Sequence, residues 1–121
     1  MASYVETVET GDAMIAMLLK ETLFDEEVVQ DVGSQISELI QNAGATDLII
    51  DLSLVVIVCS SMLGKLITLN KKIKSSGGTL RLCGVSPQLY EVFAITKLNN
   101  LFAIHDNRQQ ALESISTSVR Q

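Results

Sequence analysis

The amino-acid sequence predicts an α/β fold: a mixed, mostly parallel sheet of about five strands with about four helices, in the order ββαβαβαβα. Two observations support this prediction. Short β-rich runs alternate along the chain with segments whose apolar residues recur at helical spacing, a pattern typical of strands joined by right-handed helical crossovers. The gaps between these segments are no longer than about six residues. We therefore expect residues 1–121 to form a single domain.

The first part of the chain predicts two strands and a helix. Residues 4–8 alternate between apolar and polar side chains and residues 13–19 form a denser apolar run, so we expect an antiparallel pair with a turn at Gly11–Asp12. Asp25 is placed to cap the following helix, which carries two glutamates in its first turn and should end at residues 42–44. The apolar positions at helical spacing are Val29, Val32, Ile36, Leu39, Ile40 and Ala43.

The middle of the chain predicts a buried strand and a second helix. Residues 47–52 are β-rich, and residues 55–58 continue as a strand or a tightly packed loop, which suits a sheet covered by helices. The second helix should open at Ser60–Ser61 and stop at residues 75–78, with lysines near its C-terminal end, where the helix dipole favours cations. Its expected buried stripe is Met62, Leu66, Leu69 and Ile73.

The last part of the chain predicts two more strands, each followed by a helix. Residues 79–83 alternate as a strand, and residues 101–104 form the last short strand. Ser86 is expected as a helix N-cap with Pro87 at the first helical position. Either Asp106 or Asn107 should cap the final helix.

Composition and charge exclude several classes of function. Nine Lys and Arg against fourteen Asp and Glu give a formal net charge of −5, so we expect no nucleic-acid partner. The longest apolar run, residues 52–59, is interrupted by a serine and is shorter than the roughly 18 residues of a membrane span. Residues 1–6 do not have the pattern of a secretory signal. These features predict a cytoplasmic protein.

The residues that most often perform catalysis or bind metals are few. Cys59 and Cys83 stand in a chain with no predicted export signal, and two thiols without a second pair of ligands do not make a zinc site. His105 is the single histidine and is expected at the surface or at a strand end. We therefore expect no metal, no cofactor and no catalytic residue.

One segment between a predicted strand and a predicted helix resembles a known signature. Residues 58–66, Val-Cys-Ser-Ser-Met-Leu-Gly-Lys-Leu, resemble the Asp-Ser-Ser-Gly-Leu-Gly motif of STAS domains, the anti-sigma-factor antagonists of bacteria and their relatives. Residues 76–87 are similar to the Gly-Gly, strand, Ser-Pro passage of that family, residues 95–102 to its helix-exit segment, and Ala111–Leu112 to a pair in its last helix. The resemblance covers nearly the whole chain and implies one STAS domain over residues 1–121.

The resemblance implies a binding module and not an enzyme. In the family, the first serine of the pair is phosphorylated by a partner kinase that is also an anti-sigma factor; the unphosphorylated form binds that partner, and a serine phosphatase resets the switch. By position, Ser60 is the implied phosphoacceptor and Ser61 the second choice. We expect a monomer or weak dimer, and a partner-binding surface made of Asp25, Cys59, Ser60, Ser61, Met62 and Lys65.

Two positions depart from the family pattern and leave alternatives open. Cys59 stands where the family usually has Asp, and Met62 stands where it has Gly. Met62 either belongs to the buried stripe or contacts a partner. Ser60 either caps the second helix or presents an exposed hydroxyl.

The departures favour a second function: a STAS scaffold or regulatory subunit of a stress-sensing or transport complex, without a phosphate cycle. A third alternative, from another class, is a small thiol enzyme that uses Cys59, because a thiolate is stabilised near a helix N-terminus.

Overall fold

A five-stranded sheet organises the fold in the computed structural model, which describes residues 4–10, 13–43 and 47–119. The strands lie in the order β1-β2-β4-β6-β7, with β1 antiparallel to β2 and every other neighbouring pair parallel. This arrangement confirms the predicted mixed, mostly parallel sheet. The strand bounds are β1 (Val5–Glu9), β2 (Met14–Leu18), β4 (Leu48–Asp51), β6 (Leu80–Cys83) and β7 (Ala103–His105).

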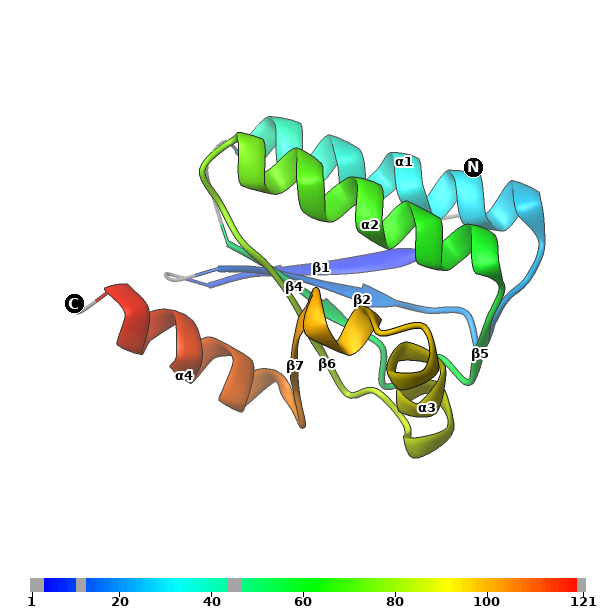
Figure 1. The fold of residues 1–121 in the computed structure, drawn as a ribbon. Coiled ribbons are helices and arrows are strands. Elements are labelled where there is room, and N and C mark those ends of the chain that lie inside the picture. Colours follow the sequence, from blue (N-terminus) through cyan, green and yellow to red (C-terminus); the bar gives the residue numbers. More distant parts are fainter. Residues whose placement is uncertain (1–3, 11–12, 44–46, 120–121) are drawn as a thin grey trace.

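The helices cover both faces of this sheet. Helices α1 (Glu26–Ala43) and α2 (Ser60–Ser75) lie side by side on one face, and α4 (Arg108–Val119) lies on the other (Figure 1). Helix α3 (Pro87–Ile95) and the 3-10 helix η1 (Leu98–Asn100) pack at one end of the sheet. Among the described residues, no helix combines the length and the apolar character needed to cross a membrane.

The two faces of the sheet bury separate hydrophobic cores because side chains alternate along each strand. Ile50 and Leu82 contribute to the larger core beneath α1, α2 and α3, whereas their neighbours Ile49 and Cys83 contribute to a smaller core beneath α4. Each fully buried Leu or Ile side chain contributes about 1.5–3 kcal/mol relative to an exposed one. The larger core therefore provides most of the stability and fixes where α1 and α2 lie.

The predicted caps of α1, α3 and α4 are confirmed. The Asp25 Oδ1 accepts a hydrogen bond from the Glu27 N–H at 2.9 Å at the start of α1. The Ser86 Oγ accepts one from the Leu89 N–H at 3.2 Å, with Pro87 in the first turn of α3. For α4, Asn107 is the cap, since its Oδ1 accepts from the Gln110 N–H at 2.9 Å.

The structure differs from the sequence prediction in two places. A second sheet pairs two very short strands, β3 (Thr22–Leu23) and β5 (Ile57–Val58). β5 lies within residues 55–58, which were predicted as a strand or a tightly packed loop, whereas β3 was not predicted because two residues are too few to show alternation. The last strand begins at Ala103, two residues later than predicted, because the N–H groups of Leu101 and Phe102 both donate to the Leu98 carbonyl, at 2.9 and 3.1 Å. The Phe102 ring packs edge-on against Phe93 in the core, with 6.2 Å between ring centroids. The predicted turn at Gly11–Asp12, and residue 44 at the end of the first helix, lie outside the described residues.

One ion pair ties α4 to the sheet. The Arg108 Nε lies 2.6 Å from the Asp51 Oδ2, and the Asp51 side chain is only 5% exposed. The Ser53 N–H and hydroxyl both donate to the Asp51 Oδ1. Burial alone would raise the pKa of Asp51, but the hydrogen bonds from Ser53 and Arg108, together with the charge of Arg108, outweigh it and lower the pKa below the usual value.

We predict that Arg108→Gln lowers the free energy of unfolding by about 1–3 kcal/mol at neutral pH, because it leaves the buried Asp51 carboxylate short of a charged donor. Since the folded-state pKa of Asp51 is depressed, this stabilisation is present above the unfolded-state pKa and is lost as the pH falls through the folded-state value. The difference between the two proteins in urea unfolding should therefore shrink below about pH 4. Lys74→Gln, the same charge change on an exposed residue, is the control; a pH-independent difference for Arg108→Gln contradicts the prediction.

Candidate functional site

The start of α2 is held in place by the short ribbon of β3 and β5. The register pairs Thr22 with Ile57 and Leu23 with Val58. The Cys59 N–H donates to the Leu23 carbonyl at 3.0 Å, which extends the pairing to the last residue before the helix. The ribbon thus fixes the direction in which the chain enters α2, and the signature segment of residues 58–66 begins on it.

Ser60 is the first residue of α2 and is exposed to solvent. The N-cap position belongs to Cys59, which has extended backbone (φ −94°, ψ 169°) and makes no side-chain capping bond. The alternative in which Ser60 caps the helix is therefore wrong: the helix begins one residue earlier than a Ser60 cap requires. In the structure, Ser60 instead lies exposed at the N-terminus of the helix, which is the other alternative.

Ser61 differs from Ser60 in its surroundings. Hydrogen bonds from Gln30 and from Ser61, with a smaller contribution from the Lys65 charge, lower the pKa of Glu26. Both serines are exposed, but the second one also contacts the first residue of α1. A phosphate on Ser61 would lie against the Glu26 carboxylate, and one on Ser60 would avoid that contact.

The remaining predicted partner residues fall into two groups. Asp25 is exposed beside the start of α1, and Cys59 and Lys65 are half-buried, so all three keep some accessible surface. Met62 is 0% exposed and packs in the larger core with the other members of its stripe, Leu66, Leu69 and Ile73. The predicted stripe is confirmed, and the expectation that Met62 contacts a partner is corrected because its side chain has no accessible surface.

The structure adds apolar residues that the sequence reasoning did not assign to the site. Phe24, Val56 and Ile57 are 56%, 53% and 43% exposed and lie on or beside the ribbon. Exposed large apolar side chains close together are typical of protein interaction surfaces. The sequence contains one sign of this surface: Phe24 directly precedes the helix cap Asp25, so its side chain does not belong to the buried stripe of the first helix.

A concave region lies at the carboxyl ends of β4 and β6. It has a volume of about 430 Å³ and is lined by Asp51, Ser53, Cys83, Gly84, Asp106, Asn107, Arg108 and Gln109. Gly84 has φ +69°, and a Cβ there would lie 2.9 Å from the Ser53 Oγ. Of the region's three charged residues, Asp51 and Arg108 form an ion pair, and the third is Asp106.

Cys83 lines this region, and His105 is paired with Cys83 in the register of the parallel strands β6 and β7. Burial, with the nearby Asp51 charge, raises the pKa of Cys83 to about 12, so the thiol stays protonated at neutral pH. His105 ends β7, as predicted, and its ring Nε2 lies 3.4 Å from the Ser114 Oγ. Among the described residues, no three His, Cys, Asp or Glu side chains gather as metal ligands.

Comparison with known proteins identifies the same family as the sequence motifs. The family model described as STAS domain matches residues 4–111. An anti-sigma-factor antagonist (STAS) domain protein from Planctomyces limnophilus has a TM-score of 0.84 at 24% identity, covering 93% of this chain and 97% of that one. An anti-sigma factor antagonist from Mycobacterium paratuberculosis has a TM-score of 0.77 at 17% identity, covering 93% and 92%.

A further similar structure is the Bacillus cell fate determinant SpoIIAA in its phosphorylated form. Its TM-score is 0.68 at 18% identity, and the alignment covers 92% of this chain and 98% of that one. At these identities the likenesses to solved structures show the fold.

We predict that the two cysteines differ in reactivity. In the folded protein near pH 8, iodoacetamide should modify Cys59 and leave Cys83 unmodified, because Cys83 is fully buried and its raised pKa keeps the thiol protonated. Peptide mapping by mass spectrometry measures both sites, and unfolding in urea is the control in which both react. Modification of Cys83 in the folded protein at the rate of Cys59 contradicts this prediction. Alkylation of Cys59 much faster than a free thiol would revive the thiol-enzyme alternative.

Proposed function

Because the chain belongs to the STAS domain family, we propose that it is an anti-sigma-factor antagonist that acts as a phosphorylation switch. In this proposal the unphosphorylated protein binds an anti-sigma factor that is also a serine kinase, phosphorylation of Ser60 releases that partner, and a serine phosphatase restores the binding form. The protein works by binding and catalyses no reaction itself.

The observation that carries the proposal is the exposure of Ser60 at the first position of α2. A kinase can reach an exposed hydroxyl without unfolding the protein. The phosphate would add roughly −1.5 to −2 charges at neutral pH, and it would do so at a helix N-terminus, where backbone N–H groups and the helix dipole stabilise anions. The fold should therefore tolerate the modification. The likeness to a Bacillus protein in its phosphorylated form agrees with this expectation.

The proposed partner-binding surface surrounds this serine. It combines the expected residues Asp25, Cys59, Ser60, Ser61 and Lys65 with the exposed apolar residues of the ribbon, Phe24, Val56 and Ile57. A partner that covers the apolar residues excludes water from the neighbouring serine. A phosphate there would then be buried without its hydration, and transferring a charged group out of water is unfavourable unless it is paired.

The departures from the family signature are compatible with this proposal. Met62 fills the larger core, so the side chain that replaces the family's glycine does not project from the binding surface. Cys59 provides the N-cap through its backbone, and its carbonyl accepts from the Met62 N–H at 3.1 Å. The aspartate of the family is therefore not needed to start the helix at this point.

We predict that a cognate serine kinase and ATP add one phosphate to the protein, on Ser60. Intact-mass measurement counts the phosphates, and peptide mapping locates them. Ser60→Ala should abolish the modification, and Ser61→Ala, its matched control, should retain it. Modification that persists in Ser60→Ala, or the absence of any phosphate, contradicts the switch; the absence combined with tight binding to transporter subunits or other STAS proteins favours the scaffold alternative.

We also predict that Ser60→Asp weakens binding to the kinase partner about a hundredfold, equivalent to about 2.7 kcal/mol at 1.4 kcal/mol per decade. The cause is the desolvation of the added negative charge. Ser60→Asn has nearly the same shape without the charge and should retain most of the affinity measured by calorimetry. Both variants should unfold at similar urea concentrations, since the helix dipole favours Asp here by no more than about 1 kcal/mol. Equal affinities of the Asp and Asn variants would overturn the proposal.

A further inference from the structure

Charged residues are segregated between the two neighbouring helices α1 and α2. Helix α1 contains four acidic residues and no basic one, and α2 contains four lysines and no acidic residue. The acidic residues are Glu26, Glu27, Asp31 and Glu38, and the basic ones are Lys65, Lys71, Lys72 and Lys74. In the part of the chain that the structure describes, no ammonium group of α2 lies within ion-pair distance of a carboxylate of α1. Lys65 lies close enough to Glu26 to help lower the pKa of that carboxyl, but it makes no ion pair with it, so Lys65 and Lys72 can still engage an external anion.

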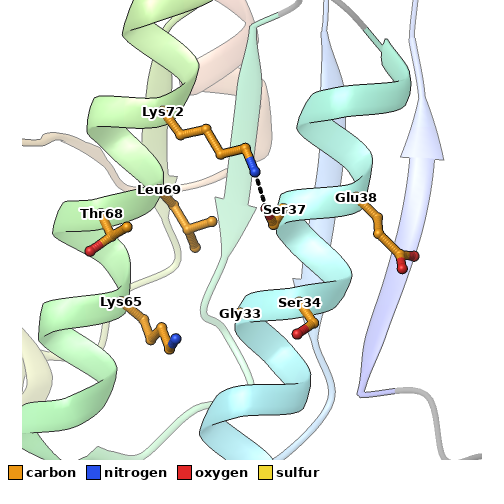
Figure 2. Close-up of a pocket in the computed structure, with 8 residues that line it drawn as sticks. All are labelled: Gly33, Ser34, Ser37, Glu38, Lys65, Thr68, Leu69 and Lys72. Carbon is orange, nitrogen blue, oxygen red and sulfur yellow. Dashed lines mark hydrogen bonds between the residues drawn. The ribbon is translucent and has the colours of Figure 1, made fainter.

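Two of these lysines line a groove between the helices. The groove has a volume of about 370 Å³, and Leu69, only 3% exposed, forms part of its lining. Figure 2 shows the side chains of Lys65 and Lys72 reaching from α2 toward α1. The Lys72 Nζ donates a hydrogen bond to the Ser37 Oγ, which holds that ammonium group inside the groove.

Gly33 makes room for the other lysine. Glycine is a poor helix former, yet Gly33 lies in the interior of α1 and is buried. A Cβ at this position would lie 3.0 Å from the Lys65 Cδ and 3.3 Å from the Cε. The missing side chain thus lets the aliphatic part of Lys65 lie across α1 and brings its ammonium group into the groove.

The interior of the groove is consequently positive. Glu38 is the acidic residue on its rim, and in Figure 2 its carboxylate points away from both lysines. The Thr68 hydroxyl donates to the Gly64 carbonyl of its own helix at 3.1 Å, so its oxygen can still accept a hydrogen bond. Lys65 and Lys72 are seven residues apart, or about 10 Å along the helix axis.

From this geometry we propose that the α1–α2 groove docks an acidic segment of a partner protein, with two carboxylates about 10 Å apart engaging Lys65 and Lys72. Carboxylates two turns apart on a helix have the same backbone spacing of about 10 Å as the two lysines, so a helical acidic segment matches them better than a single phosphate or sulfate does. This site shares Lys65 with the proposed partner-binding surface, but its second lysine, Lys72, lies outside that surface. It requires no modification of Ser60 and is testable on the unmodified protein.

The test is an NMR titration of the whole protein with a short alanine-based helical peptide that carries two glutamates seven residues apart. We expect the largest amide shifts at the groove, around Gly33, Ser37, Lys65, Thr68 and Lys72. The double variant Lys65→Gln, Lys72→Gln should bind the peptide about tenfold more weakly, because its two ion pairs with the glutamates of the peptide are lost. A peptide with glutamine in place of both glutamates should produce no shifts at the groove.

The matched control is Lys71→Gln with Lys74→Gln. These two lysines are exposed on the same helix, do not line the groove, and give the same change of net charge. We expect this variant to lose less than twofold in affinity. Equal losses of peptide affinity in the two double variants would mean nonspecific attraction to α2 and would overturn the proposal. Inorganic phosphate that produces the same amide shifts and displaces the peptide would also overturn it. Circular dichroism of both variants checks that they remain folded.

Discussion

The arrangement of the candidate sites depends on one constraint, the burial of a single stripe of α2 against the sheet. Met62, Leu66, Leu69 and Ile73 recur at helical spacing and are almost fully buried. Because a helix rotates by about 100° per residue, burying this stripe directs Ser60 to solvent. The same rotation sends Lys65 and Lys72 toward α1. The hydrophobic face of one helix thus determines the position of the serine and of the lysines.

The sites at the end and along the side of α2 have different physical characters. Around Ser60 the surface combines exposed apolar side chains with a helix N-terminus, so added negative charge is compatible with the fold and unfavourable for an apolar partner. Along the groove, the ammonium groups of Lys65 and Lys72 favour a negatively charged partner. A single helix can therefore present one surface suited to an apolar partner and another suited to a negatively charged partner, and neither requires a conformational change.

In the concave region at the carboxyl ends of β4 and β6, polar residues hold elements of the fold together. Such strand ends often hold ligands in α/β proteins. Here Asp51 is satisfied by Ser53 and Arg108, and the buried Cys83 has a pKa of about 12. The charges are used to attach α4 to the sheet. Asp51 and Cys83 thus have shifted pKa values because of this internal pairing and burial, although neither belongs to the proposed binding surface.

The sequence by itself determined the fold class, the order of the strands of the main sheet and of the four α-helices, the caps Asp25 and Ser86, and the buried stripe of α2, because these depend on periodicity and on local hydrogen bonding. Only the tertiary structure decided that Cys59 rather than Ser60 precedes the helix, that Phe24 and Ile57 are exposed on a common ribbon, and that Arg108 pairs with Asp51. The ribbon and the ion pair join residues far apart in the chain, and local patterns do not encode such contacts. Exposure likewise depends on what packs against a residue, which is known only when every element is in place.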